Sequence, residues 1–324
     1  MLLRIFKTSH PLAWILIILI LIIIRAMLFA FLFNESHIIE SNSFTAGLTH
    51  YLALNYPVTS HILSLLIIIP SGFFFNKIAQ NANLFKGIHY LLFFFFSVFS
   101  FYSPENLVIT PFLISYPLTL IGLAVIFNQT KTKNSLPNIF NASFFIGLSS
   151  LIYPPNTLFF LILLISLFYL NSTTWRTITV AIIGTLTPLF FHDTLVYALN
   201  IDISTFKTFS TNFFGSFSIS SLPSTNSSLL LFVLLLTQIP SFFISSSKTI
   251  NKIRKPLLLM LFYFGIGLVF TGFTKYNHPI LFNILIIPIT IIFTSFQLEV
   301  KRWWITDIVF LGLIAAITIN YIQI

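Results

Sequence analysis

Apolar runs long enough to cross a membrane follow one another along this chain, and only short polar segments separate them. Hydrophobic residues make up 57% of the sequence and charged residues 7%. A water-soluble domain usually carries about 25% charged residues, so this chain has too few to cover a surface that faces water all round. A helix of about 20 apolar residues spans the hydrocarbon layer. The sequence therefore predicts an all-α fold, a polytopic transmembrane helical bundle that forms a single integral membrane domain over residues 1–324.

The apolar runs predict about 11 spans, within a range of about 10–12. Residues 139–170 are too long for one upright helix, and Tyr153-Pro154-Pro155-Asn156 divides them. Consecutive prolines remove backbone donors and break helices, so we expect two short spans there. Two longer polar segments, residues 34–57 and 200–228, are predicted to be outer loops. The predicted spans cover residues 11–33, 58–75, 88–102, 107–127, two segments of 139–170, 177–199, 229–244, 256–273, 279–296 and 303–321.

Basic residues fall mostly on one side of this threading. Among the 16 Lys and Arg residues, only Lys207 and Lys275 are placed outside, and Arg25 lies within the first span. Cytoplasmic loops of membrane proteins carry an excess of Lys and Arg, so the N-terminus is predicted to be cytoplasmic, in a bacterial inner membrane. A single span over 139–170 would move every later loop to the other side, so the charge bias also favours a break at Pro154-Pro155. The residues predicted to lie inside are Arg4, Lys7, Lys77, Lys86, Lys131, Lys133, Arg176, Lys248, Lys252, Arg254, Lys255, Lys301 and Arg302.

Composition also excludes several kinds of chemistry. The chain has no Cys, which rules out disulfides, thiolate metal sites and Cys nucleophiles. The basic inner loops account for its net charge of +9, so no nucleic-acid partner is expected, and neither a metal nor another cofactor is predicted. Arg4 and Lys7 precede an apolar run that is too long for a signal peptide, so we expect this run to be retained as the first span.

The first outer loop is the strongest candidate for a catalytic site. Glu35, His37 and Glu40 follow the first predicted span within a few residues of one another. Carboxylates and an imidazole at such spacing can serve as a general base, a ligand or a hydrogen-bonding clamp. The alternative is that a loop at the membrane surface is polar only because water solvates it.

Three further places carry candidate substrate-binding residues. Arg25 lies inside the first apolar run, where a charge is costly and marks either a functional site or a structural pair. The adjacent His192 and Asp193 are predicted to point to different sides of a helix, and they are either site residues or a satisfied buried pair. Lys275 and His278 flank a predicted turn on the outer side, where they can hold a phosphate or simply form a hairpin.

Several segments resemble a family of multi-pass bacterial inner-membrane proteins that has no established activity. The similarity is carried by the start Met1-Leu2-Leu3-Arg4-Ile5-Phe6-Lys7 and by the segment from Asn141 to Pro155, which reads NASFFIGLSSLIYPP. Trp175-Arg176, with Gly184 and Pro188 in the span that follows, is similar to the same family. This resemblance covers most of the chain and implies a multi-pass membrane fold.

More distantly, the chain resembles class C glycosyltransferases, which use polyprenyl-phosphate sugar donors. Those enzymes place an acidic residue in the first outer loop, and Glu35 or Glu40 occupies a comparable position. Tyr153-Pro154-Pro155 and His278 with Pro288 are similar to a broken mid-chain pair of spans and to a late turn in those enzymes. The loop here has no Asp, and no large outer domain follows.

Three functions are compatible with these features. The resemblance implies a glycosyltransferase-like protein that acts on lipid-linked sugar at the outer face, with membrane lipid and a polyprenyl-phosphate sugar as its partners. A non-catalytic assembly or accessory component of a cell-envelope machine, with envelope proteins as partners, is the alternative that the scarcity of polar residues in the spans favours. A transporter is less favoured, because the break at Pro154-Pro155 has no counterpart in the other half of the chain.

Overall fold

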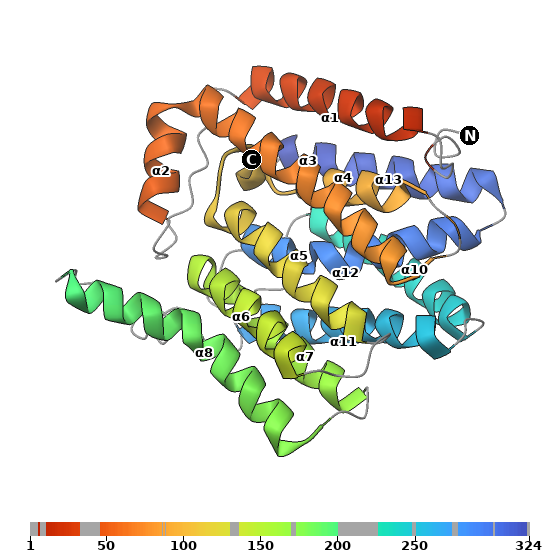
Figure 1. The fold of residues 1–324 in the computed structure, drawn as a ribbon. Coiled ribbons are helices and arrows are strands. Elements are labelled where there is room, and N and C mark those ends of the chain that lie inside the picture. The colour runs from red at the N-terminus through yellow and green to blue at the C-terminus, as the bar shows by residue number, and fades with distance from the viewer. Residues whose placement is uncertain are drawn as a thin grey trace.

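The protein is all-α in a computed structural model, in which the described residues form twelve α-helices and no strand (Figure 1). The structure describes residue 6 and residues 11–32, 46–85, 87, 89–129, 136–169, 173–199, 226–247, 251–273, 278–300 and 302–322. The helices are α1 (Pro11–Leu32), α2 (Ala46–Asn55), α3 (Pro57–Asn81), α4 (Leu91–Ser100), α5 (Pro111–Gln129), α6 (Leu136–Ile152), α7 (Leu158–Tyr169), α8 (Trp175–Ala198), α10 (Asn226–Ser247), α11 (Asn251–Phe273), α12 (His278–Glu299) and α13 (Trp303–Ile322), with 3-10 turns η2 (Pro104–Leu107) and η3 (Pro154–Thr157).

Four helices in the described part of the chain are long and apolar enough to cross a membrane. They are α3, α5, α8 and α13, which carry 18 to 25 residues in apolar runs. Helices α3, α8 and α13 expose many large apolar side chains, as Phe190 and Ile183 do on α8, whereas α5 is largely buried. Helices of this length and composition are typical of a membrane protein.

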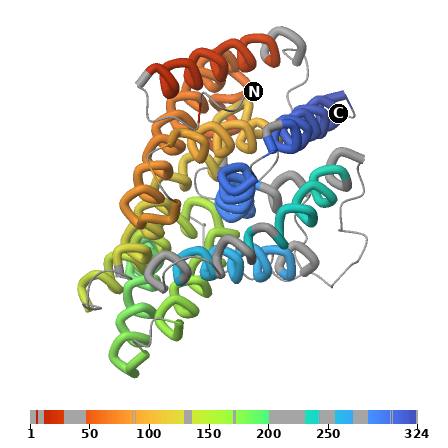
Figure 2. The backbone as a smooth tube through the Cα atoms, turned by 90° about the vertical axis from the view of Figure 1, so that its right-hand side faces the viewer, coloured from red at the N-terminus to blue at the C-terminus, as the bar shows by residue number. Residues whose placement is uncertain are grey.

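The helices form one array in which α1 and α8 lie at opposite edges (Figures 1 and 2). The ten-residue α4 lies inside the array, and every residue from Leu91 to Ser100 is buried. Its phenylalanines pack on α12, where Phe99 and Phe293 place their ring centroids 4.8 Å apart. Aromatic side chains bury the largest apolar surfaces, so this Phe-rich helix forms much of the core.

The third predicted span is shorter than expected, because the helix covers only Leu91–Ser100 of residues 88–102. Asn83 and Gly87 adopt positive φ angles of 53° and 84°, which interrupt the chain between α3 and α4. Pro104 begins η2 beyond the other end of α4. At about 1.5 Å per residue the helix is about 15 Å long, half of the hydrocarbon thickness. The irregular segment that follows it, residues 101–107, is buried in protein, as non-helical backbone at membrane depth must be.

The first predicted outer loop contains a helix that the sequence analysis missed. Residues 46–55 form α2, directly before α3 begins at Pro57. Its Ala and Leu residues favour a helix, although its polar residues make it too weakly apolar to register as a span. Thr49 and Ala53, one turn apart, are buried, and the rest of its surface is largely exposed.

The predicted break at Tyr153-Pro154-Pro155-Asn156 is confirmed. Helix α6 ends at Ile152, η3 occupies Pro154–Thr157, and α7 starts at Leu158. Asn156 is buried and donates from Nδ2 to Ser115 Oγ at 2.8 Å, which ties the break to α5. The ring of Tyr153 packs edge-on against Phe112 with centroids 5.3 Å apart.

Hydrogen bonds at the two ends of the array show that α1, α4 and α13 run in one direction and that α3 and α12 run in the opposite one. At one end the backbone N–H of Tyr90, before α4, donates to the Phe6 carbonyl, before α1, at 3.1 Å. Gln297 near the end of α12 donates to the Thr306 carbonyl at the start of α13 at the same end, at 3.2 Å. At the opposite end α1, α4 and α13 finish and α3 and α12 begin, around η2, through the contacts described below.

Helices α6 and α8 cross at close range through small residues. Thr177, Ala181, Gly184 and Pro188 are the buried residues of α8, one turn apart along a single face. A Cβ atom added at Gly184 would overlap Ser143 Oγ and would lie 3.0 Å from the Phe140 carbonyl oxygen. Small residues allow backbones to approach in this way in membrane helices.

Substituting Gly184→Val is expected to lower the free energy of unfolding by about 1–3 kcal/mol, because the added atoms meet the Ser143 side chain and the Phe140 backbone carbonyl in a closely packed crossing. Gly265→Val on α11 is the matched control, since a Cβ there meets nothing within 4 Å. Denaturant unfolding of both variants in detergent, followed by circular dichroism, checks the expectation. Equal stability of the two variants would contradict the close crossing.

Candidate functional site

The candidate site is a cluster of buried polar groups around η2, where the ends of five helices meet. Arg25 comes from α1, Ser60 and Ser64 from α3, Asn283 from α12, and Asn320 and Tyr321 from α13. These side chains reach the segment that joins α4 to α5. We call this group the η2 cluster; its members are Arg25, Ser60, Ser64, Phe101, Glu105, Asn106, Leu107, Asn283, Asn320 and Tyr321.

Arg25 is the centre of the η2 cluster and is almost completely buried, with 2% of its surface exposed. Its Nη2 atom donates to Ser64 Oγ, to the Leu107 carbonyl and, at 3.0 Å, to the Asn106 carbonyl. Its guanidinium carbon lies 5.3 Å from the centre of the Phe101 ring. Within the described ranges, the buried Nε and Nη1 atoms have no hydrogen-bond partner. Nη2 alone thus carries the hydrogen bonds.

No acid among the described residues forms an ion pair with Arg25. The three acceptors of Arg25 are a hydroxyl and two carbonyl oxygens. His61 and Tyr321 lie close enough to Arg25 to interact with it electrostatically. The positive charge is therefore met by neutral dipoles and by the face of an aromatic ring, and by no carboxylate in the described ranges.

Two serines of α3 fix the backbone beyond η2. Ser60 Oγ accepts the backbone N–H of Ile109 at 2.8 Å. Ser64 Oγ contacts the Leu107 carbonyl at 3.2 Å and the His61 carbonyl at 2.9 Å. Both serines are fully buried. They satisfy groups of a non-helical segment that has no regular partners, which is how such a segment is tolerated inside a helical array.

Asn106 joins η2 to the start of α12. Its Nδ2 atom donates to Asn283 Oδ1 at 2.7 Å and to the Ser100 carbonyl at 3.0 Å. From α13, Asn320 Nδ2 donates to the Tyr102 carbonyl at 2.8 Å and the Tyr321 hydroxyl to the Phe101 carbonyl at 2.7 Å. Neighbouring Ile284 accepts the Tyr263 hydroxyl of α11 at 2.5 Å. The connection between α4 and α5 is therefore held from several sides.

Glu105 is a buried acid in the same connection, outside the helices long enough to cross a membrane. It lies on η2 with 7% of its surface exposed, and its Oε1 atom finds no hydrogen-bond partner in the part of the chain that the structure describes. Burial raises the pKa of this carboxyl from about 4.5 to about 8. The side chain is therefore mainly neutral at pH 7. Glu105 lies between two apolar runs of the sequence, but it was not among the predicted site residues.

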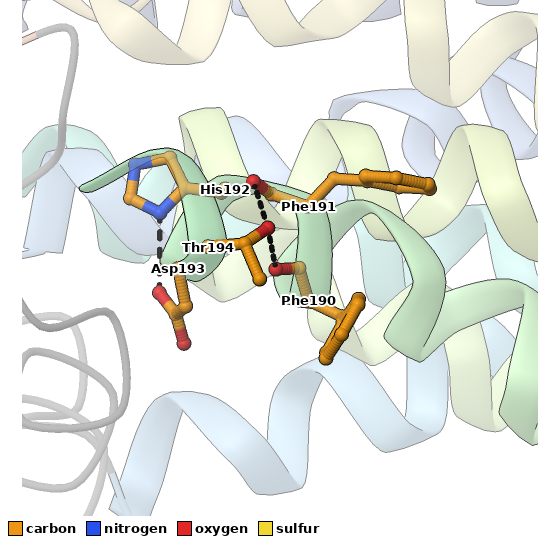
Figure 3. A network of polar contacts seen from close by, with 5 residues as sticks. All are labelled: Phe190, Phe191, His192, Asp193 and Thr194. Carbon is orange, nitrogen blue, oxygen red and sulfur yellow. Dashed lines mark hydrogen bonds and ion pairs between the residues drawn. The ribbon is translucent and has the colours of Figure 1, made fainter. Parts of the chain in front are cut away.

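His192 and Asp193 contact one another on α8, contrary to the prediction that they point to different sides (Figure 3). His192 Nδ1 lies 3.2 Å from Asp193 Oδ1, because both side chains bend toward the same surface of the helix. The Thr194 hydroxyl donates to the carbonyls of Phe190 and Phe191 at 2.8 and 2.9 Å. The pair lies on a helix at the edge opposite α1, so the structure does not bring it to Arg25.

The other predicted site residues cannot be placed in the η2 cluster directly. Glu35, His37, Glu40 and Lys275 lie outside the described residues. His278 begins α12, although its side chain also lies outside the description. Their proposed roles stay predictions. Within the described ranges, no three His, Asp or Glu side chains gather closely enough to hold a metal ion.

No protein-family model, curated protein or solved structure matches the chain. The function proposed below therefore rests on the residues of the chain and on their geometry.

Proposed function

We propose that this chain is a multi-pass inner-membrane protein that acts on a polyprenyl-phosphate-linked sugar at the outer face, in the manner of a class C glycosyltransferase. In this proposal the N-terminus is cytoplasmic, about 11 spans cross the bilayer, and the η2 end of the array faces outward. The distribution of basic residues supports this orientation, because Lys77, Arg176 and Arg302 fall at the end opposite η2.

The observation that carries the proposal is the joining of α1 and α12 through the η2 cluster. Arg25 of α1 binds the Asn106 carbonyl, and the Asn106 side chain binds Asn283 of α12. The helix before the acidic segment, α1, and the helix after the predicted turn, α12, are therefore linked through the same buried polar cluster. This link supports the proposal that the candidate acids and the candidate phosphate ligands act together.

The proposed roles follow from the charges that each segment carries. Glu35 or Glu40 takes the proton from an acceptor hydroxyl while that oxygen forms a bond to the anomeric carbon of the sugar. The bond from this carbon to the phosphate oxygen breaks, and the polyprenyl phosphate leaves. Lys275 or His278 stabilises the negative charge on the departing phosphate.

The double substitution Glu35→Gln and Glu40→Gln is expected to lower transfer by about a hundredfold or more, since it removes the general base but keeps the size of both side chains. Mass spectrometry of envelope glycans in a deletion strain that expresses each variant measures the effect. Glu299→Gln is the control, because Glu299 is exposed at the other end of α12.

Two results are informative here. The catalytic role is supported if the double variant is present in the membrane in normal amounts and the glycans still resemble those of the deletion strain. Restoration of wild-type glycans by the double variant removes that role and favours an accessory function instead. Recovery of a stable complex with envelope proteins in mild detergent would then identify the protein as an assembly component.

A further inference from the structure

One nitrogen of the Arg25 guanidinium makes all of its hydrogen bonds to the described residues. These three bonds use Nη2, whereas Nε and Nη1 are buried and find no acceptor in the described part of the chain. Buried donors normally have a partner in the protein or in a bound molecule. Five N–H groups in a planar fork make Arg the side chain that suits phosphate and carboxylate best. The unused donors therefore point to a ligand with negatively charged oxygen atoms.

The missing counter-charge supports the same conclusion. A charged side chain inside a membrane protein is costly unless it is paired. Neutral acceptors and the Phe101 ring stabilise the guanidinium only in part. No carboxylate pairs with Arg25 in the described part of the chain; Glu105, the buried acid nearest in sequence to its carbonyl partners, forms no ion pair with it. A bound anion would supply the counter-charge that the described residues do not provide.

The site is also held in place before any ligand arrives. Ser64, Asn106 and Leu107 come from two separate segments and orient the guanidinium together. Ser64 is itself bonded to the Leu107 carbonyl, so the acceptors are fixed relative to one another. Fixing a binding group in advance reduces the entropy that binding removes, which raises affinity.

We propose that Arg25 binds a phosphate group through Nε and Nη1, at the η2 end of the array between α1, α3 and the α4–α5 connection. The chemistry is that of a phosphate monoester or diester oxyanion, which either a lipid head group or a free phosphate supplies. The lipid source rests on the proposed function, because a polyprenyl phosphate is the substrate proposed there. The anion site itself does not depend on that function.

The test measures ligand binding to the full-length protein in nanodiscs of zwitterionic lipid. Farnesyl phosphate, inorganic phosphate and uncharged farnesol are titrated separately, and binding is followed by calorimetry. Wild-type protein is expected to bind a phosphate ligand but not farnesol. Arg25→Met is expected to weaken binding by about tenfold to a hundredfold, because charge-assisted hydrogen bonds are lost.

Two control variants separate the site from general effects of charge. Arg176→Met removes an arginine that stacks over Trp175 on α8, at a guanidinium-to-ring distance of 5.7 Å, and is expected to leave binding unchanged. Arg25→Lys keeps the charge but loses the planar fork, so its affinity is expected to fall below that of wild type. This variant also decides the matter if Arg25→Met does not fold.

The outcomes distinguish a lipid phosphate from a soluble phosphate, and both from a carboxylate of the chain that occupies the site. Tight binding of farnesyl phosphate alone assigns the site to a lipid, and equal binding of inorganic phosphate assigns it to the soluble anion. Wild-type affinity in a folded Arg25 variant overturns the proposal, as does the absence of phosphate binding in wild type. Binding that appears only after Glu35→Gln and Glu40→Gln overturns it too, because a carboxylate then fills the place of the ligand. Phosphate binding combined with normal glycans in the Glu35→Gln and Glu40→Gln strain would remove the transferase function and leave the anion site intact.

Discussion

The free energy of unfolding is expected to fall by on the order of 5 kcal/mol as the pH rises from about 4.5 to about 8, through the ionisation of Glu105 alone. Burial raises the pKa of Glu105 in the folded protein to about 8, whereas its ordinary value is about 4.5. Between these values the folded state keeps a proton that the unfolded state releases. The contribution is therefore fully present below pH 4.5, declines as the pH rises, and is absent above pH 8.

Comparison with Glu105→Gln isolates this contribution from those of the other titrating groups. The amide is neutral at every pH, so the difference in stability between wild type and variant should change across this window and be constant outside it. Glu299→Gln serves as the matched control, because Glu299 is exposed and its substitution should leave the wild-type pH dependence in place. Chemical unfolding in detergent at closely spaced pH values provides the measurement. A pH-independent difference between wild type and Glu105→Gln would show that the carboxyl is not buried as described.

The sequence predicted most helices because apolar runs and prolines are local signals. Pro154-Pro155 identified the break between α6 and α7, and the apolar run after Pro11 identified α1 almost to its last residue. The count of about 11 spans and the sidedness of the chain remain predictions, because the structure contains no membrane to test them.

The burial of α4 inside the array could not be predicted, because a run that is apolar all round is compatible with both a lipid-facing span and a buried core helix. Its limits depend on the positive φ angle at Asn83 and on contacts with residues far along the chain, such as Phe293. Helix α2 was missed for the opposite reason. Its polar residues interrupt the apolar run that a predicted span requires.

The candidate site was predicted in part. Arg25 was recognised because a charge inside an apolar run is rare. Glu105 was not, because its burial depends on the packing of five helices around η2 and not on its neighbours in sequence. The contact between His192 and Asp193 was also missed. Adjacent residues start about 100° apart around a helix, and only their side-chain rotamers bring the ring nitrogen and the carboxylate within 3.2 Å.

Replacing Asn106 by Leu is expected to lower the free energy of unfolding by about 3–5 kcal/mol, a large effect for a change that conserves volume. The Asn106 side chain is fully buried and donates to both Asn283 Oδ1 and the Ser100 carbonyl. Its loss leaves two buried acceptors without this donor, and each unsatisfied group costs about 1–3 kcal/mol. Unfolding in detergent, followed by circular dichroism, measures the loss.

A double-mutant cycle with Asn283→Leu separates the hydrogen bond from general repacking. The double variant should be less destabilised than the sum of the two single variants, because no amide remains unpaired across η2 and α12. Asn55→Leu on the exposed surface of α2, where Nδ2 bonds only to the Tyr51 carbonyl of its own helix at 3.1 Å, should change stability by less than about 0.5 kcal/mol. Strict additivity of Asn106→Leu and Asn283→Leu would mean that the two side chains do not act together. In that case the carbonyls that orient Arg25 would have to be held by α3 and α13 alone, and phosphate binding should survive Asn106→Leu unchanged.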